Sequence, residues 1–154
     1  IIMEKSNIWD RVLSSNEMIK KEFSIGNSYI KMGLIFWLIF GVILLLGGIG
    51  IFVIPIVLFY YLFYLKRANH YAFTNKRVLI IKGWLSTKLT SIDYDKITDI
   101  TVLEPFLDRL IYKTGSLAIN TAGTALHEVI LQHIEDPYKI KQELDKIRER
   151  GNKK

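Results

Sequence analysis

The stretch LLLGGIGIF, residues 44–52, carries three glycines within four positions, inside a run, residues 32–65, that contains no charged residue. As a single helix, these 34 residues would extend for about 51 Å at roughly 1.5 Å per residue, well beyond a hydrocarbon core about 30 Å thick. Broken at Gly47, Gly48 and Gly50, the run becomes two apolar segments of 15 residues each. Because glycine tolerates the positive φ of a tight reversal, the pattern predicts two membrane helices joined by a glycine turn.

Charge placement predicts the orientation of this hairpin. Every Lys and Arg lies before residue 32 or after residue 65, and the glycine turn carries no charge. By the positive-inside rule both termini face the cytoplasm, which predicts a multi-pass protein of the cell membrane. Two alternatives stay open: a single long, tilted helix whose tail is buried in a partner, and a re-entrant wedge that never crosses the bilayer.

The water-facing residues are basic overall. The formal net charge is +6; residues 1–31 hold five Lys or Arg against four acids, and residues 66–154 hold sixteen against eleven. Such an excess beside a membrane favours anionic lipid headgroups as partners, whereas no dense basic stripe or known motif indicates nucleic acid. The chain has no cysteine, which excludes disulfides, zinc–thiolate sites and thiol nucleophiles.

The first 30 residues contain one short helical pattern. Ile8 and Val12, like Trp9 and Leu13, are four residues apart, which places each pair on one helix face. The pattern fits a short interfacial helix and equally a helix packed on a soluble domain. The chain is thus predicted to comprise four parts: an N-terminal interfacial segment (1–30), a transmembrane hairpin (31–66), a soluble domain (67–150) and a basic tail (151–154).

From residue 69 the pattern changes to short strands. NHYAFT (69–74) and RVLIIKG (77–83) are rich in β-branched and aromatic residues, with a turn at Asn75 and Lys76 between them and Gly83 ending the second. Four further segments bounded by turn residues follow: WLSTKLTSI (84–92), ITDITVLE (97–104), SLAINTA (116–122) and HEVILQHI (127–134). Six or seven antiparallel strands are therefore expected.

Two further features complete this domain. The stretch PFLDRLIYKTG, residues 105–115, has room for one helical turn after Pro105 and a chain turn at Gly115. The chain closes with a helix that has Asp136 as N-cap, Pro137 at its first position and one apolar face formed by Ile140, Leu144 and Ile147. The predicted fold class is an α+β membrane protein: a transmembrane hairpin followed by a small antiparallel β-barrel or sandwich capped by a C-terminal helix.

Several of these residues resemble a known family. They are Y-x-x-T-N-x-R at Tyr71, Thr74, Asn75 and Arg77, then Gly83, then I-T-D-I around Asp99, then G-S-L-A-I-N-T-A-G from Gly115 to Gly123. This series resembles the bacterial and archaeal PH-like domain, which often follows a membrane hairpin, as in the YdbS-like membrane proteins. The resemblance covers residues 31 to about 150. It implies a pleckstrin-homology-like fold of seven antiparallel strands closed by a C-terminal helix, and it implies no established ligand.

The motif residues are expected to have structural roles. Thr74 and Asn75 suit a hairpin turn through hydrogen bonds from side chain to backbone. Gly83 and Gly123 suit positive φ or close packing, and Asp99 is expected to bond a neighbouring backbone amide.

Basic side chains provide the candidate lipid contacts. In eukaryotic PH domains the phosphoinositide site lies at the first hairpin, and the resemblance places Lys76 and Arg77 near the same place, although this sequence lacks the longer loop of those domains. Generic contact with anionic headgroups is the hypothesis for six residues: Lys66, Arg67, Lys76, Arg77, Lys82 and Lys88. A solvated basic rim is the alternative.

Catalytic and metal-binding patterns are weak. His127 and His133 are six residues apart in one expected strand, so they share a face but lie about 20 Å apart at roughly 3.3 Å per residue, too far for one metal ion. Acids in residues 93–104 mimic a calcium loop, but Thr98 stands where that loop needs glycine. Since no serine or threonine lies in a nucleophile-elbow pattern either, the sequence predicts no enzyme activity, cofactor or metal.

Three classes of function fit the sequence. The first is a membrane-anchored interaction module that binds a protein partner, or a second copy of itself, through a strand edge or the groove beside the last helix. The second senses or handles anionic lipid. The third is a small pore or transporter subunit, which the absence of charge inside the hairpin disfavours.

Overall fold

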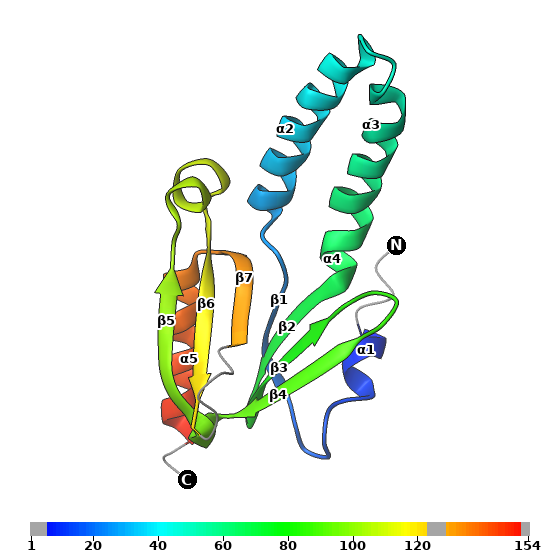
Figure 1. Ribbon diagram of the computed structural model, residues 1–154. Coiled ribbons are helices and arrows are strands. Elements are labelled where there is room, and N and C mark those ends of the chain that lie inside the picture. The colour runs from blue at the N-terminus through cyan, green and yellow to red at the C-terminus, as the bar shows by residue number, and fades with distance from the viewer. Residues whose placement is uncertain (1–5, 123–128, 152–154) are drawn as a thin grey trace.

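The computed structural model describes residues 6–122 and 129–151. In these residues seven strands form two antiparallel sheets, a helical hairpin rises from one end of them, and a helix follows the last strand (Figure 1). The first sheet has the order β1-β2-β3-β4 and the second the order β5-β6-β7. The predicted α+β organisation, with antiparallel strands closed by a C-terminal helix, is confirmed.

The strands follow the predicted segments closely. The first sheet consists of β1 (Ile19–Phe23), β2 (Asn69–Thr74), β3 (Arg77–Lys82) and β4 (Lys88–Asp93). A 3-10 turn, η2 (Tyr94–Lys96), leads to the second sheet, which consists of β5 (Ile97–Leu103), β6 (Thr114–Thr121) and β7 (Val129–Glu135). A π-helical turn, η3 (Asp108–Tyr112), lies in the β5–β6 connection. Gly123 and His127 lie outside the described residues.

The predicted chain turn at Gly115 is wrong. Gly115 lies inside β6 opposite Ile134, and the residue in a left-handed conformation is Lys113, with φ of +51°. A Cβ on Gly115 would lie 2.8 Å from Pro137 Cγ and 2.9 Å from Glu104 Cγ. Close packing against the start of the last helix, and not a turn, therefore requires glycine at this position.

One core fills the space between the two sheets and α5 (Pro137–Gly151), which lies along the second sheet (Figure 1). On β2, β3 and β6 its inward-facing side chains come from alternate positions, as the period of two requires: Tyr71 and Phe73, Val78 and Ile80, and Leu117 and Ile119. On β7 the inward residues Leu131 and Ile134 are three positions apart, because the register with β6 shifts between them. Ile140 and Leu144 of α5 are buried in this core and Ile147 packs against it, which confirms the predicted apolar face of the helix.

The first sheet is buried on its outer face as well. The run VLII in β3 is apolar without alternation, which is typical of a strand covered on both faces. Leu79 and Ile81 point outwards with Ala72 and pack against Trp9 of α1 (Ser6–Asp10). Trp9 is only 2% exposed. Of the two readings of the N-terminal segment, the structure therefore shows the helix packed on the soluble domain.

Strand β1 also lies in this N-terminal segment, where the sequence pattern predicted only a helix. Phe23 of β1 pairs with Tyr71 of β2. The strand was missed because its residues IKKEF contain three consecutive charges and show no clear apolar alternation. Since β1 precedes the helical hairpin and β2 follows it, the hairpin is an insertion between the first two strands of the sheet.

The helical hairpin consists of α2 (Asn27–Leu45) and a second helical arm, Gly50–Ala68, made of α3 (Gly50–Phe59), a π-helical turn η1 (Tyr60–Tyr64) and α4 (Leu65–Ala68). The chain reverses between the two arms, where Gly48 has φ of +75°. A Cβ on Gly50 would meet the carbonyl oxygen of Gly41, so only glycine lets the arms approach this closely. The alternative of one long tilted helix is thereby excluded.

Strand direction gives the domain a hairpin end and a far end. β2 begins at Asn69, directly after α4, and runs away from the hairpin (Figure 1). The β2–β3 turn at Asn75 and Lys76 therefore lies at the far end, about 17 Å away at roughly 3.3 Å per residue. The β3–β4 loop (residues 83–87), the β5–β6 connection (residues 104–113) and the start of α5 lie at the hairpin end.

Backbone hydrogen bonds join the base of the hairpin to both sheets. The Gly83 N–H donates to the Ala68 carbonyl at 2.7 Å, which connects the second arm to the first sheet. The Gly26 N–H donates to the His133 carbonyl at 2.7 Å, which connects the start of the first arm to β7. The Asn69 side-chain amide adds a bond of 3.1 Å to the Leu65 carbonyl. Several hydrogen bonds thus connect the base of the hairpin to the β-sheet domain, in addition to the chain itself.

Candidate functional site

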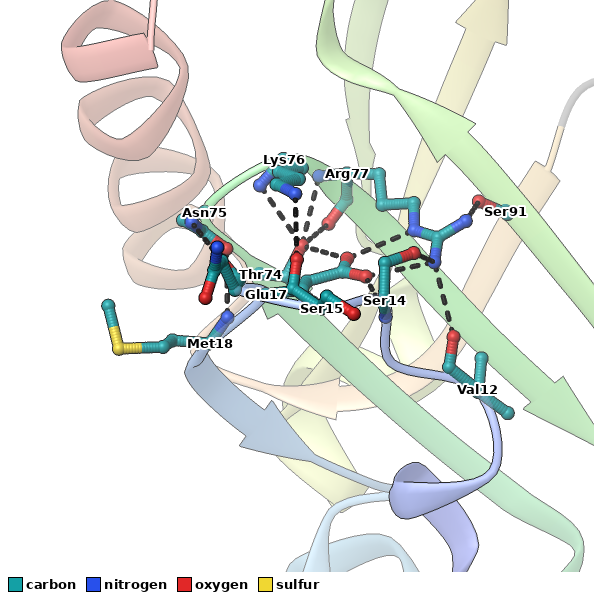
Figure 2. A network of polar contacts seen from close by, with 11 residues as sticks. Val12, Ser14, Ser15, Glu17, Met18, Thr74, Asn75, Lys76, Arg77 and Ser91 are labelled. Carbon is teal, nitrogen blue, oxygen red and sulfur yellow. Dashed lines mark hydrogen bonds and ion pairs between the residues drawn. The ribbon is translucent and has the colours of Figure 1, made fainter.

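A buried carboxylate organises a polar network at the far end of the domain (Figure 2). Glu17, in the loop before β1, has a fully buried side chain. It accepts hydrogen bonds from Arg77 Nε at 3.0 Å and Nη2 at 2.9 Å, from the Thr74 hydroxyl at 2.7 Å and from the Ser14 N–H at 2.9 Å. The Arg77 hydrogen bond outweighs the opposing effect of burial and lowers the pKa of Glu17 to about 2, so the carboxylate is ionised and fully paired.

Thr74 and Asn75 hold the β2–β3 turn with their side chains, as the motif predicts. The Thr74 hydroxyl oxygen accepts the N–H groups of Lys76 at 3.1 Å and Arg77 at 3.0 Å. Asn75 Oδ1 accepts the Met18 N–H at 2.9 Å, and the Asn75 N–H donates to the Met18 carbonyl at 3.1 Å. The motif therefore clamps the loop before β1 onto the turn. We call this network of Glu17, Thr74, Asn75 and Arg77 the N-terminal clamp.

The predicted contact of Arg77 with lipid headgroups would compete with the bonds that this side chain makes inside the N-terminal clamp. Besides Glu17, its guanidinium donates to the Val12 carbonyl, the Ser14 hydroxyl and the Ser91 hydroxyl, each at 3.2 Å (Figure 2). These bonds use the donors that a phosphate would need. Lys76 is exposed, but it lies in the same turn at the far end, away from any bilayer that the hairpin enters. The connection between β1 and β2, the first two strands of this sheet, is formed by the two helical arms.

The remaining basic candidates lie at the hairpin end. Lys82 is half-buried and its ammonium donates to the Ile130 carbonyl at 2.8 Å; burial, with a smaller contribution from Lys88, lowers its pKa. Lys66 and Arg67 in α4 and Lys88 at the start of β4 are exposed. Of the six basic residues proposed from sequence, these three are therefore both accessible and close to the hairpin.

A cleft of about 420 Å³ lies beside the hairpin base, between β1 and the β7–α5 junction. Its lining includes three lysines and three acids: Lys21, Lys66, Lys139, Glu22, Glu135 and Asp136. Two of these are already paired, since Lys21 lies 3.0 Å from Glu143 and Glu135 accepts both the N–H and the hydroxyl of Ser28. With its charges balanced, the cleft offers no preference for an anion.

The other motif residues serve the fold. Gly83 has φ of +103°, and a Cβ there would meet the Ser86 carbonyl oxygen. Tyr71 is buried in the core, and burial raises its pKa to about 12. The expectation for Asp99 is wrong: its carboxylate is exposed on β5 and accepts the Thr101 hydroxyl at 3.2 Å, not a backbone amide.

His133 packs between Asp108 and Tyr29 at the base of the hairpin. His133 Nδ1 lies 3.7 Å from Asp108 Oδ1, and the His133 ring stacks on Tyr29 with ring centroids 3.8 Å apart. Burial lowers the pKa of His133 more than Asp108 raises it, so the imidazole is neutral at pH 7. Within residues 6–122 and 129–151, no three His, Asp or Glu side chains come together in an arrangement that could hold a metal ion.

Two features were not foreseen from sequence. Glu17 was not predicted as the partner of Arg77, because the two residues are 60 positions apart and no local pattern links them. The second feature is the exposure of the apolar side chains in the β3–β4 loop and the β5–β6 connection, where the sequence pattern predicts a strand and a helical turn. The signal that could have indicated exposure there is a short apolar pair between turn residues, since Trp84 and Leu85 stand between Gly83 and Ser86.

Two antiparallel sheets packed over one core and closed by a C-terminal helix define a pleckstrin-homology-like fold. The family model for the bacterial PH domain matches residues 29–150, and the chain belongs to this family. PH domains in general are modules that bind lipids or proteins, and the family is generally non-catalytic.

Solved structures show the same fold. A DUF1696 family protein with a pleckstrin-homology domain from Shewanella loihica PV-4 is 14% identical, with a TM-score of 0.53, and the similarity covers 94% of each chain. A pleckstrin homology domain from Shewanella amazonensis SB2B is 12% identical, with a TM-score of 0.53, and the similarity covers 96% of this chain and 98% of that one. At these identities the likeness concerns the fold alone. No curated protein matches the chain.

Proposed function

We propose that this protein is a membrane-anchored, non-catalytic interaction module, in which the helical hairpin holds the PH-like domain at the cytoplasmic face of the cell membrane. The observation that carries the proposal is the outward-facing apolar surface of the hairpin. In the described residues, both arms are 19 residues long and apolar enough to span a membrane, and only 17% and 22% of the two spans are buried. The core helix of a soluble protein would be mostly buried.

Length and charge support full crossing over a re-entrant wedge. Each arm is about 28 Å long at roughly 1.5 Å per residue, which matches a hydrocarbon core of about 30 Å. The charged residues Lys31, Lys66 and Arg67 all lie at the base, whereas the turn between the arms is uncharged. By the positive-inside rule these charges support a cytoplasmic position for the base, the domain and both termini, with residues 31–66 as the proposed membrane segment.

Unpaired strand edges support a protein partner or a second copy of the chain as the main ligand. Among the described strands, β4 pairs only with β3 and β5 pairs only with β6. Such edges can add a strand from another chain. Anchoring to the membrane raises the effective concentration of the domain at that surface, so that a weak contact suffices.

Recognition of anionic lipid is the second candidate. Lys66, Arg67 and Lys88 favour it, because they are exposed at the hairpin end, where each contributes roughly 1 kcal/mol of attraction to an anionic surface. This attraction is general, and the balanced cleft beside the hairpin adds no specific headgroup site. Binding that depends on these three side chains and is lost at high salt would support this function over the first.

Topology is tested with single cysteines, since the chain has none of its own. Leu46→Cys places a thiol in the 94% exposed position at the turn, and Lys146→Cys places one on the exposed face of α5. A membrane-impermeant maleimide should label residue 46 only from outside intact cells and residue 146 only in inverted vesicles. Labelling of both residues from the same side would refute the crossing hairpin.

Partner binding is tested by photo-crosslinking in native membranes. A photoreactive amino acid at Thr101, exposed on β5, should give a discrete product, and the same group at Lys146 on α5 is the matched control. A product of twice the chain mass would identify self-association. Equal, diffuse crosslinking at both positions would count against a specific partner at the β5 edge.

A further inference from the structure

The exposed apolar side chains of the domain gather at one end. Outside the hairpin and its turn (residues 27–68), the described residues include ten large apolar side chains that are exposed: Met18, Trp84, Leu85, Leu89, Leu103, Phe106, Leu107, Leu110, Ile111 and Tyr138. All except Met18 lie at the hairpin end, in or beside the β3–β4 loop, the β5–β6 connection and the start of α5. Chance scatter of surface apolar residues would not select one end.

Two segments dominate this set, and each stands beside one arm of the hairpin. Leu85 in the β3–β4 loop is 91% exposed and Phe106 in the β5–β6 connection is 74% exposed. The Trp84 ring lies 5.9 Å from the Phe59 ring of α3, and the Tyr112 ring lies 4.9 Å from the Tyr29 ring of α2, between centroids. In Figure 1 the β5–β6 connection rises beside α2, and the β3–β4 loop lies on the α4 side.

The two contacts lie at different heights along the hairpin, since Tyr29 is the third residue of α2, on the domain side of Lys31, whereas Phe59 lies deeper in the second arm. Phe59 lies nine residues from the end of the second arm at Ala68, about 13 Å along the helix. Lys66 and Arg67 lie between that end and Phe59, so Trp84 contacts the hairpin on the membrane side of these charges. Tryptophan and tyrosine prefer the interface between headgroups and hydrocarbon.

The charges around the two segments have the sign that suits this surface. In the β5–β6 connection, Arg109 and Lys113 are exposed, whereas of its two acids Glu104 is half-buried and Asp108 is turned towards His133 with a side chain only 14% exposed. Lys88 follows the β3–β4 loop and is also exposed. A surface of apolar side chains with basic neighbours is typical of segments that lie in the interface of anionic bilayers.

We propose that the hairpin end is a bilayer-contact surface, in which the β3–β4 loop and the β5–β6 connection insert Trp84, Leu85, Phe106 and Leu107 into the lipid interface on both sides of the hairpin. This inference rests on the proposed function, because it requires the arms to enter the same bilayer. It adds that the domain contacts the bilayer at three places, the hairpin, the β3–β4 loop and the β5–β6 connection, which fixes its tilt. The far end and the β4 and β5 edges then face the cytoplasm.

The test uses the full chain reconstituted in vesicles of mixed neutral and anionic phospholipid, with single cysteines carrying an environment-sensitive fluorophore. Leu85→Cys and Leu107→Cys report on the two segments. Met18→Cys, 59% exposed at the far end, is the matched control, and Ile56→Cys, 67% exposed in α3, reports on the hairpin. Emission at residues 85 and 107 should shift to the blue and be quenched by nitroxide-bearing lipid to an extent comparable with residue 56, while residue 18 stays unquenched.

Each other outcome has a definite meaning. Quenching at residue 56 with residues 85 and 107 behaving like residue 18 would overturn the bilayer-contact surface and leave the proposed function standing. Absence of quenching at residue 56 as well would refute both. A blue shift at residues 85 and 107 without quenching by lipid would show that a second copy of the chain covers this surface, which also overturns the inference.

A measurement without any label guards against an artefact of the fluorophore. With Trp9→Phe and Trp37→Phe, Trp84 becomes the sole tryptophan, because the chain has three. Its fluorescence should fall in vesicles of brominated lipid relative to the same vesicles without bromine. Unchanged emission would contradict insertion of the β3–β4 loop.

Discussion

Replacing Glu17 by Gln tests the N-terminal clamp, because this change removes one charge and keeps the shape of the side chain. Pairing with Arg77 lowers the pKa of Glu17 from 4.5 to about 2, and at about 1.4 kcal/mol per unit this shift corresponds to about 3 kcal/mol of folding stability. Since the pKa is depressed in the folded state, this stability is present above pH 4.5 and is lost as the pH falls towards 2. The variant should therefore be less stable by about 3 kcal/mol at pH 7 and should lack this acid-dependent loss.

Denaturant unfolding of the full chain in detergent micelles measures the effect. Trp9 packs under the segment that the clamp holds, so its fluorescence, in a background of Trp37→Phe and Trp84→Phe, reports directly on this part of the domain. The matched control is Asp145→Asn, which breaks the surface pair with Lys141 at 2.8 Å and should cost less than about 0.5 kcal/mol. A loss below about 1 kcal/mol for Glu17→Gln, or an unchanged pH profile between 4.5 and 2, would refute the reasoning.

Three further changes test the fold that positions the hairpin. Gly50→Ala introduces a Cβ against the carbonyl of the facing arm and should lower hairpin stability by about 1–3 kcal/mol. Gly47→Ala, with no atom closer than 3.8 Å to its Cβ, should be nearly neutral. Thermal melts followed by helical ellipticity compare the two variants, and equal melting temperatures would contradict the packed turn. Leu144→Ala empties a fully buried position in the core and should cost about 2–5 kcal/mol in denaturant unfolding, with exposed Lys146→Ala as the control that should not respond. Gly83→Ala forces a side chain into φ of +103° and should cost about 1–3 kcal/mol, seen as faster amide exchange in β3 and β4; protection equal to that of the parent chain would argue against strain at this loop.

Much of the fold was readable from local pattern. The segments that became β2, β3, β5 and β7 show strand composition bounded by turn residues, and Asp136 and Pro137 mark the start of α5. These signals depend only on neighbours in sequence, because the ring of Pro137 fixes its own φ and because apolar and polar residues alternate along a strand with a period of two. β1 carried no such signal, because an edge strand with three consecutive charges is specified by the partner that it pairs with.

The candidate site was less accessible to sequence reasoning than the fold. Arg77 looked like a free cation because its partner, Glu17, lies 60 residues away, and the buried state of that carboxylate depends on the folded loop around it. Lys76 looked suited to lipid contact until the direction of β2 placed its turn at the far end. Basic residues are easy to count in a sequence, but the end of the domain on which each one lies depends on how the strands run.

By itself, the sequence determined the apolar arms, their separation at Gly48, the antiparallel strands and the amphipathic face of α5, because each of these follows from hydrophobic periodicity and from the backbone freedom of a few residues. Only the tertiary structure decided that the hairpin is inserted between β1 and β2, that Arg77 neutralises Glu17, and that Trp84, Leu85, Phe106 and Leu107 gather beside the arms. The physical reason is that pairing and burial act between residues distant in sequence, and chain direction alone determines which of them meet.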